Sequence, residues 1–527
     1  MLFYLSKDKV VKLSSLKFKR LPKIIVDLST QIEINDKRYM IQHKTLGALK
    51  ASGYQSKSIK EELRANLIQK LRNKETVFEG VLGFEDTVIP DIERAILSRH
   101  NILMLGLRGQ AKTRIARLLV SLLDEYIPAV AGSEINDDPL LPISRYAVDL
   151  IAEKGDDTPI EWLHRDTRYV EKLATPDVSV ADLIGDVDPI KAATLKLSYS
   201  DERVIHFGLI PHSHRSIFVI NELPDLQARI QVALFNILQE GDIQIRGFKL
   251  RMPLDIQFIF TANPEDYTNR GSIITPLKDR IESQILTHYP KTIEIAQSIT
   301  EQEARLTDSQ KETIRVQKQS AKLLEMISFA ARESEYIDEK SGVSARLSIS
   351  GLENLASTAE RRMLINDEKS TSTRLTDFWG VVPAITGKVE LVYEGEQEGP
   401  YMVALHLMNK AIKDLFLEYF PNPERLKRNQ RDPYDAIKMW FTSGKTVDLL
   451  NDCTDEHYEK ELKKVAGLEK LVHSIKIADA DKLFFMELAL HGLSEFNIVN
   501  KDMIENKLTF RDLLANMLDD DDDGHLN

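Results

Sequence analysis

A glycine-containing loop, GLRGQAKT at residues 106–113, has the spacing of groups that hold phosphates. It fits the pattern G-x-x-x-x-G-K-[ST] with one change, because Ala111 stands where the second glycine belongs. Backbone N–H groups of such a loop, together with the start of the next helix, bind phosphate oxygens. Lys112 would reach the β- and γ-phosphates and Thr113 would ligate Mg²⁺. The alternative is a glycine-containing turn that ends in a helix-start lysine. The predicted nucleotide-binding residues are Gly106, Arg108, Gly109, Gln110, Ala111, Lys112, Thr113 and Arg114.

A second candidate is the apolar run SIFVI (216–220), which ends in the pair Asn221-Glu222. In nucleotide-hydrolysing sites an Asp at the first position holds Mg²⁺ through a water molecule, and the following Glu polarises the attacking water. Glu222 fits this role. Asn221 can accept a hydrogen bond from a metal-bound water but supplies no negative charge, so we place it at the metal with Thr113 and expect weakened metal affinity. An Asn221→Asp change should then lower the Mg²⁺ requirement. The alternative is a buried strand that ends in a polar turn.

Further along the chain, three polar residues complete the candidate hydrolytic set. Asn263 follows the apolar run DIQFIFTA (255–262) and would orient the attacking water, unless it only forms an Asn-Pro turn. Arg280 and Arg346 could each neutralise charge on the γ-phosphate, although either one alone is more typical of a surface ion pair. The predicted catalytic residues are therefore Glu222, Asn263, Arg280 and Arg346.

The elements that must position these residues alternate between apolar strands and amphipathic helices. Strands are predicted at 101–105, 216–220 and 255–262, with a helix after each of the first two. This alternation is typical of a parallel sheet covered on both faces. Two amphipathic helices precede the sheet, a polar stretch at 131–201 shows few periodic segments, and 241–253 reads as a hairpin. Beyond Pro290 the pattern is almost entirely helical, with amphipathic stretches at 320–334, 348–364, 402–420 and 480–496.

Composition narrows the class of protein. The chain has 527 residues, 43% hydrophobic and 29% charged, which is typical of a soluble globular protein of several domains. The net charge of −12 makes nucleic acid an unlikely partner, and no apolar run is long enough for a membrane span. One cysteine, Cys453, fits a reducing cytoplasm and is expected to be a bland or buried thiol. His212 and His214 are expected in an exposed turn rather than at a metal.

The order of these motifs is recognisable. The segments GLRGQAKTR, SIFVINELPDL, EGDIQIRGFKLRMP, FTANPED, LKDRIES and SARLSISGLENLASTAERR resemble the AAA+ ATPases, and most closely the clade of the magnesium chelatase I subunit and the MoxR-type ATPases. The resemblance covers roughly residues 80–365. The C-terminal part, including residues 385–400, resembles bacterial chelatase-like proteins more loosely.

The resemblance implies an α/β fold: a three-layer parallel-sheet nucleotide-binding domain with a helical lid, followed by a mostly helical C-terminal region. ATP and Mg²⁺ would lie between core and lid, beside the lead-in at residues 83–88. Asn263 would be the sensor, Arg346 the lid sensor, and Arg280 the finger that acts in the site of a neighbouring subunit. The extra hairpin would lie around Arg246-Gly247. The predicted domains are an N-terminal extension (1–42), an α/β core with lead-in helices (43–298), a lid (299–380), a helical C-terminal domain (381–518) and an acidic tail (519–527).

Family members form rings, commonly hexameric, and often work with a protein that contains a von Willebrand factor A-like domain. The leading hypothesis is therefore an ATP-driven ring motor that remodels a protein partner. One alternative is the motor subunit of a magnesium or other metal chelatase. Another is a nucleotide-binding scaffold with low turnover, which Ala111 and Asn221 motivate. A σ54-type activator ranks low, because no GAFTGA-type loop is present.

Overall fold

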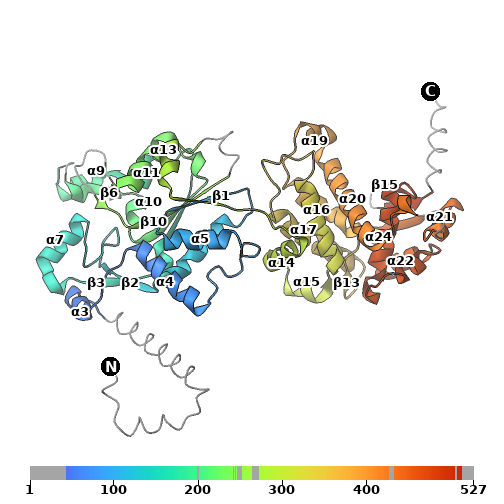
Figure 1. Cartoon of the computed structure of the whole chain (residues 1–527), viewed down its shortest axis with the longest axis horizontal. Helices are drawn as coiled ribbons and strands as arrows, with labels where there is room; N and C mark the ends of the chain where they lie inside the picture. Colours follow the sequence, from blue (N-terminus) through green and yellow to red (C-terminus); the bar gives the residue numbers. More distant parts are fainter. Residues whose placement is uncertain are drawn as a thin grey trace, which may run out of the picture.

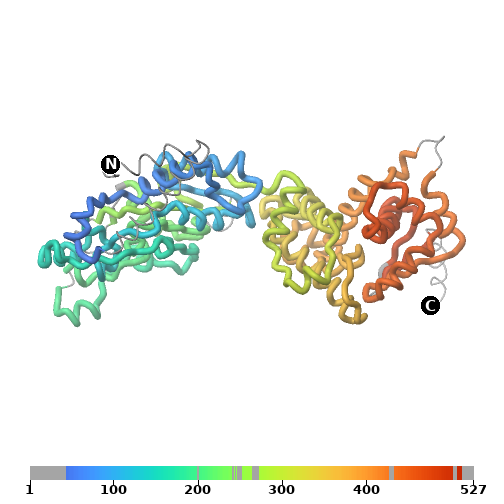
Figure 2. Tube along the Cα trace, turned by 90° about the horizontal axis from the view of Figure 1, so that it is seen from below, coloured from blue at the N-terminus to red at the C-terminus, as the bar shows by residue number. Residues whose placement is uncertain are grey.

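The computed structural model of the protein describes residues 43–198, 201–240, 242–243, 245, 252–263, 272–426, 432–504 and 507–512. The predicted N-terminal extension, the hairpin tip at Arg246-Gly247 and the acidic tail lie outside these residues. Figure 1 shows an α/β part, coloured blue to green, and a helical part, coloured yellow to red. Figure 2, turned by 90°, shows the same succession along the long axis.

The α/β part is built on one parallel sheet of five strands. Their order across the sheet is β11-β1-β10-β7-β4, and every neighbouring pair is parallel. The strands are β1 (Ile102–Leu105), β4 (Tyr169–Leu173), β7 (Ser216–Asn221), β10 (Ile256–Ala262) and β11 (Ser283–Leu286). The three strands predicted from apolar runs, β1, β7 and β10, lie next to one another in the centre. All residues of these three strands are buried, including Asn221 and Ala262 at the ends of β7 and β10.

Helices cover both faces of this sheet, because side chains of successive strand residues point to opposite faces. Ile102 and Met104 of β1 belong to a hydrophobic cluster that includes residues of α4 (Ile59–Asn73), α5 (Val88–Leu97) and α6 (Lys112–Leu118). Leu103 and Leu105 belong to a second cluster with α11 (Ala228–Glu240) and α13 (Thr275–Arg280). The predicted α/β class, a parallel sheet between two helical layers with a helical region after it, is confirmed.

The helix α4 begins at a side-chain cap. Ser58 caps α4, its side-chain oxygen accepting a hydrogen bond from the Glu61 backbone N–H at 3.3 Å. Leu63 and Leu67 are buried, whereas Leu71, one turn further along the helix, is exposed. The helix α4 therefore buries only its N-terminal two thirds.

Two strands of the main sheet were not predicted. β4 lies in the stretch at 131–201, and β11 follows α13; both are edge strands. The stretch at 131–201 also contains α7 (Arg145–Lys154) and α9 (Pro189–Leu195), and it contributes β3 (Ile160–His164), which pairs with β2 (Tyr126–Val130). Outside the main sheet, β5 (Gly185–Val187) pairs with β6 (Ile205–Phe207), and the two ends of the predicted hairpin, β8 (Asp242–Ile243) and β9 (Met252–Pro253), pair antiparallel.

A buried ion pair fixes the start of β4. The two guanidinium nitrogens Nη1 and Nη2 of Arg168 donate to the two carboxylate oxygens of Glu62 on α4, each at 2.7 Å. Arg168 Nε donates to the Arg215 carbonyl oxygen at 2.9 Å, just before β7 begins. Both side chains of the pair are almost fully buried, so removing one partner would leave an uncompensated charge, at a cost of about 3–5 kcal/mol. The register of β4 beside β7 is therefore firmly set.

After β11 the chain forms mainly helices, and one hydrophobic cluster runs through them from Leu323 to Phe510. The helices of the first part are α14 (Ile293–Glu303), α15 (Asp308–Thr313), α16 (Lys318–Arg332), α17 (Arg346–Ile365), α18 (Val382–Thr386) and α19 (Tyr393–Glu398). The helices of the second part are α20 (Pro400–Tyr419), α21 (Asp435–Thr442), α22 (Asp455–Lys463), α23 (Leu468–His473) and α24 (Lys482–Glu495).

The expectation that the C-terminal part is almost all helical is wrong at its end. β14 (Val447–Leu450), β16 (Lys507–Arg511) and β15 (Asn500–Ile504) form an antiparallel sheet in that order. This sheet packs beside α24, most of whose residues are buried. The four long predicted helices exist as α16, α17, α20 and α24, with bounds shifted by a few residues.

A buried carboxylate joins the two parts of this helical region. Glu487 of α24 accepts hydrogen bonds from the backbone N–H groups of Leu375 (2.8 Å) and Thr376 (2.9 Å), and from the Tyr458 hydroxyl (2.6 Å). These partners compensate the cost of burying the carboxylate. The loop after α17 is thereby tied to the C-terminal helices.

No helix in the described ranges combines the length and the apolar character that crossing a membrane would need. Cys453 is a buried free thiol beside the Arg374 guanidinium.

Candidate functional site

The predicted phosphate loop joins the end of β1 to the start of α6. Gly109 has φ of +74°, a conformation that glycine adopts without strain. At Gly106 a Cβ atom would lie 1.8 Å from Thr287 Oγ1, so only glycine fits beside β11. Thr287 Oγ1 also donates to Gln110 Oε1 at 2.7 Å. The loop is therefore shaped by close contact with the segment that leads into the helical region.

Ala111, which replaces the second glycine of the pattern, is in the left-handed conformation at φ +56° and ψ +12°. An L-residue pays about 1–2 kcal/mol for this conformation. The loop thus keeps the backbone shape that glycine would give it, at an energetic cost.

We expect Ala111→Gly to raise the free energy of unfolding by on the order of 0.5–1 kcal/mol, because the strain it relieves exceeds the entropy that glycine adds to the unfolded chain. Urea unfolding measures this gain. Ala116→Gly is the matched control, since Ala116 is a buried residue in the middle of the same helix and should lose about 1 kcal/mol or more. Equal destabilisation by both changes would show that residue 111 is not strained.

Lys112 is the first residue of α6 and is almost fully buried, with 8% of its surface exposed. Its ammonium group donates to the carbonyl oxygens of Gly106 and Leu107, the latter at 3.0 Å, and to Asn263 Oδ1 at 2.8 Å. The cation therefore lies over the loop, at the point where the ends of β1 and β10 meet.

Asn263 connects this lysine to Glu222. Its amide nitrogen Nδ2 donates to Glu222 Oε2 at 3.2 Å, while its Oδ1 accepts from Lys112. Glu222 follows β7 directly and has φ of +57°, which turns the chain sharply at the carboxyl end of the strand. Three residues from three separate parts of the sequence thus form a continuous hydrogen-bonded row along one edge of the sheet.

A cavity of about 640 Å³ lies beside this row. It is bounded by the loop, the lead-in segment and the first turn of α17, where Arg346 is exposed. Its walls include Val81, Phe84, Thr113, Glu222, Asn263 and Arg346. Of the residues predicted to bind nucleotide, those from Arg108 to Arg114 line this cavity and Gly106 does not. That nucleotide binds here stays a prediction.

Two arginines of the loop contact the helical region. Arg108 pairs with Glu390, and the Ser341 hydroxyl together with this guanidinium lowers the pKa of the Glu390 carboxyl. Arg114 pairs with Glu303 at the end of α14; hydrogen bonds from Gln302 and from Arg114 lower the pKa of that carboxyl. These ion pairs join the loop and the start of α6 to the helical region.

Arg280 does not line the cavity. It is the last residue of α13, its side chain is 40% exposed, and it pairs with its neighbour Asp279 at 2.7 Å. Its guanidinium lies 5.6 Å from the centre of the Phe235 ring. Within one chain it is therefore separate from the Lys112–Asn263–Glu222 row.

Asn221 has its amide group engaged on both sides. Oδ1 accepts a hydrogen bond from the Thr261 hydroxyl at 3.0 Å, and Nδ2 donates to Glu171 Oε1 at 2.6 Å. Glu171 lies in β4 and was not among the predicted site residues. The only sign of it in the sequence is a glutamate inside the run YVEKL, which no motif marks.

The oxygen-rich groups near the loop fit Mg²⁺. Thr113 and Glu222 line the cavity and offer a hydroxyl and a carboxylate, whereas Asn221, whose amide oxygen accepts from the Thr261 hydroxyl, is not among the lining residues. Mg²⁺ prefers oxygen ligands and is usually held by one or two side chains with substrate phosphates. In the described part of the chain, His, Cys, Asp and Glu form no group of three or more that could hold a metal by themselves.

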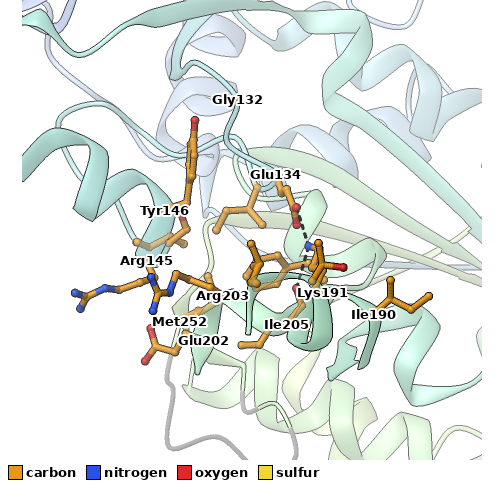
Figure 3. Close-up of a pocket in the computed structure, with 16 residues that line it drawn as sticks. Gly132, Glu134, Arg145, Tyr146, Ile190, Lys191, Glu202, Arg203, Ile205 and Met252 are labelled. Atoms are coloured by element: carbon orange, nitrogen blue, oxygen red, sulfur yellow. Dashed lines mark hydrogen bonds and ion pairs between the residues drawn. The ribbon is translucent and has the colours of Figure 1, made fainter. Parts of the chain in front are cut away.

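A second cavity, of about 490 Å³, lies away from this site around α7, α9 and β6 (Figure 3). Lys191 projects toward Glu134, and its ammonium group pairs with that carboxylate at 2.8 Å and donates to the Ile205 carbonyl at 3.2 Å. Arg203 pairs with Asp201. None of the predicted site residues lines this cavity.

The expectation for His214 is wrong. His212 is exposed, but His214 is buried, and its Nδ1 accepts a hydrogen bond from the Asp255 backbone N–H at 3.0 Å. Burial, helped by the Arg215 charge, lowers the pKa of His214 to about 4. It is a buried residue at the starts of β7 and β10 rather than part of an exposed turn.

No family model matches the chain. It is similar to the solved structure of a candidate ATPase from Cytophaga hutchinsonii, with 16% identity over 67% of this chain and 96% of that chain and a TM-score of 0.27. It is similar to a complex of the BchI and BchD subunits of magnesium chelatase, with 17% identity, coverage of 61% and 98%, and a TM-score of 0.31. It is also similar to the structure of Hsp104 with ATPγS and FITC casein, with 14% identity over 62% of this chain and 53% of that chain and a TM-score of 0.36. At TM-scores this low, the likenesses carry no argument about activity or partners.

The described structure itself gives the class. A five-stranded parallel sheet, a phosphate-loop sequence between β1 and α6, and a helical region that bounds the adjoining cavity give an α/β fold with a candidate phosphate site. That the chain is an AAA+ ATPase stays a prediction. Membership of the magnesium chelatase and MoxR clade stays a prediction.

Proposed function

We propose that the chain binds ATP with Mg²⁺, hydrolyses it, and works as a ring-shaped motor that remodels a protein partner. The observation that carries the proposal is the row of hydrogen bonds from Lys112 through Asn263 to Glu222, beside a cavity of about 640 Å³. A cation, an amide and a carboxylate in this order match phosphate binding, water orientation and water activation.

Each group has a definite task in this proposal. The loop's backbone N–H groups and the start of α6 bind the phosphates. Lys112 exchanges its contact with Asn263 Oδ1 for the phosphate oxygens, and this leaves Asn263 to orient the attacking water. Glu222 accepts the proton of that water. Arg346 at the start of α17 compensates charge on the phosphate from the lid side. Mg²⁺ bound with the nucleotide would neutralise phosphate charge near Thr113 and Asn221.

The position of Arg280 supports the proposal that the chain forms a ring. Its place at the end of α13, outside the cavity of its own chain, fits a finger that acts in the site of the next subunit. We propose a homo-oligomeric ring, commonly hexameric in such proteins, with a von Willebrand factor A-like protein as partner. The mass of the assembly with and without ATP tests the ring, and co-purification from the native organism tests the partner.

We expect Lys112→Ala to weaken ATP binding by roughly 10- to 150-fold, the equivalent of the about 1.5–3 kcal/mol that a hydrogen bond to a charged group contributes. Calorimetric titration with ATP and Mg²⁺ measures this loss. Lys154→Ala, at the exposed end of α7, is the control and should bind ATP like the wild type. Unchanged affinity in Lys112→Ala would place the phosphates elsewhere.

A low-turnover nucleotide-binding scaffold is the second candidate. It is favoured by the amide of Asn221, which is already hydrogen bonded to Thr261 and Glu171 and carries no charge. Steady phosphate release by the purified wild type would exclude the scaffold. Tight ATP binding without any release would exclude the motor.

A further inference from the structure

The charge that Asn221 lacks is present on the neighbouring strand. β4 runs parallel to β7 with Leu173 beside Asn221 and Glu171 beside Val219, so Glu171 and Asn221 point to the same face of the sheet. The Glu171 carboxylate reaches along that face to Asn221 Nδ2, at 2.6 Å. The Glu171 carboxylate is therefore one hydrogen bond away from Asn221, the side chain that is predicted to contact a metal-bound water.

The orientation of the Asn221 amide follows from this contact. A carboxylate only accepts hydrogen bonds, so the amide NH₂ group must face Glu171, and Oδ1 must face the Thr261 hydroxyl. An aspartate at position 221 would place a second carboxylate oxygen at hydrogen-bond distance from the first. Two carboxylates so close cannot both ionise without a large penalty. Asparagine at 221 is the residue that Glu171 permits.

The other carboxylate oxygen of Glu171 is held by the phosphate-loop helix. Arg117 of α6 contacts Oε2 through Nε and Nη2, both at 3.0 Å, and the Tyr169 hydroxyl donates to it at 3.1 Å. Arg117 is four residues after Thr113, so both project from the same side of α6. Glu171 is thus fixed between the strand that carries Asn221 and the helix that carries Thr113.

We propose that Glu171 supplies, through Asn221, the negative charge that attracts Mg²⁺ to the nucleotide site. Glu171 is a positioning residue: it orients the Asn221 amide and adds its charge behind it. The inference rests on the proposed ATP-binding function. In other nucleotide-hydrolysing sites one aspartate holds Mg²⁺ through water, whereas here Asn221 on β7 and Glu171 on β4 would share that task. The inference also changes the expectation for Asn221→Asp, which should restore the metal preference only when Glu171 is neutralised at the same time.

The test uses the full chain in four forms: wild type, Glu171→Gln, Asn221→Asp, and both changes together. The measured quantity is the ratio of ATP affinity with Mg²⁺ to ATP affinity with EDTA. We expect Glu171→Gln to reduce this ratio by roughly 10- to 100-fold, as loss of an outer partner of a metal site does, with the affinity in EDTA unchanged. The double variant, which moves the carboxylate from position 171 to 221, should recover a ratio close to that of the wild type.

Thermal unfolding in EDTA provides a readout that does not involve ATP. Asn221→Asp should unfold at a lower temperature than the wild type because of repulsion from Glu171, and the double variant should regain most of the loss. A purely structural role for Glu171 would lower the unfolding temperature of Glu171→Gln without changing the Mg²⁺ ratio, and this result would overturn the inference.

Glu161→Gln is the matched control. Glu161 is an exposed strand carboxylate on β3, and it accepts a hydrogen bond from the Gly132 backbone N–H at 3.4 Å, so its Mg²⁺ ratio should equal that of the wild type. If wild-type protein binds ATP but Glu171→Gln keeps the full Mg²⁺ ratio, the inference fails and the proposed function stands. If wild-type protein binds no ATP, the proposed function fails and the inference fails with it.

Discussion

A Glu222→Gln variant is expected to bind ATP with wild-type affinity and to hydrolyse it roughly 10²–10⁴-fold more slowly, because the amide cannot accept the proton of the attacking water. The Asn263 amide that now donates to the Glu222 carboxylate can donate to the Gln carbonyl instead, so the row beside the cavity should keep its shape. Single-turnover hydrolysis and a binding titration, performed on the same preparation, separate the two effects.

Glu202→Gln is the control for this change. Glu202 lines the second cavity, not the one beside Lys112, and its variant should hydrolyse ATP at the wild-type rate. Wild-type hydrolysis by Glu222→Gln would remove Glu222 from the reaction. A loss of ATP binding in Glu222→Gln would instead show that the carboxylate is needed to hold the site together.

Arg280→Ala should lower ATP hydrolysis by roughly 10³–10⁵-fold, which is the contribution of an arginine finger. If the finger acts between subunits, mixing Arg280→Ala with Glu222→Gln should restore activity. In a mixed ring an Arg280→Ala subunit keeps its own Glu222 and receives an intact Arg280 from a Glu222→Gln neighbour. Titrating one variant into the other and following phosphate release measures the recovery.

The control for the mixing experiment is Lys278→Ala, an exposed cation in the same helix, which should retain activity when assayed alone. An activity that never exceeds the sum of the two separate variants, at any mixing ratio, would contradict the placement of Arg280 at a neighbouring site. Arg280 would then be the surface ion-pair partner of Asp279 and nothing more.

The central strands could be predicted because each is buried on both faces and therefore reads as a continuous apolar run. The edge strands could not. β4 has the sequence YVEKL and β11 has SQIL, and both are only partly buried. One side of an edge strand meets solvent or polar neighbours, so the strand carries polar residues. Because it lacks a continuous apolar run, it is hard to recognise in the sequence.

The C-terminal sheet was missed for a related reason. β14 and β16 contain four or five residues each and alternate buried with partly exposed positions, a signal too short to separate from loop sequence. The helix α24 was predicted as an amphipathic stretch, but in the structure it is buried nearly all round. Tertiary packing, which one sequence does not display, decides both cases.

The residues of the candidate site also fall into those that the sequence could predict and those that it could not. Lys112, Asn263 and Glu222 could be proposed from local patterns because each ends or follows a recognisable strand. Glu171 could not, since its contact with Asn221 joins positions 50 residues apart and depends on the register of an edge strand. Ala111 lies between these cases: the sequence shows the substitution, and the structure shows that the left-handed backbone of the glycine is kept.

The hydrophobic cluster that runs from Leu323 to Phe510 makes the second half of the chain a lever arm. The contacts of Glu487 with Leu375 and Thr376 couple its inner and outer parts, so these parts cannot turn independently. If the helical region turned about the segment that follows β11, the C-terminal sheet would move furthest, because β15 lies toward the end of the helical part that is remote from the α/β part (Figure 1). A small change around a phosphate group would thus become a long stroke at the C-terminal end.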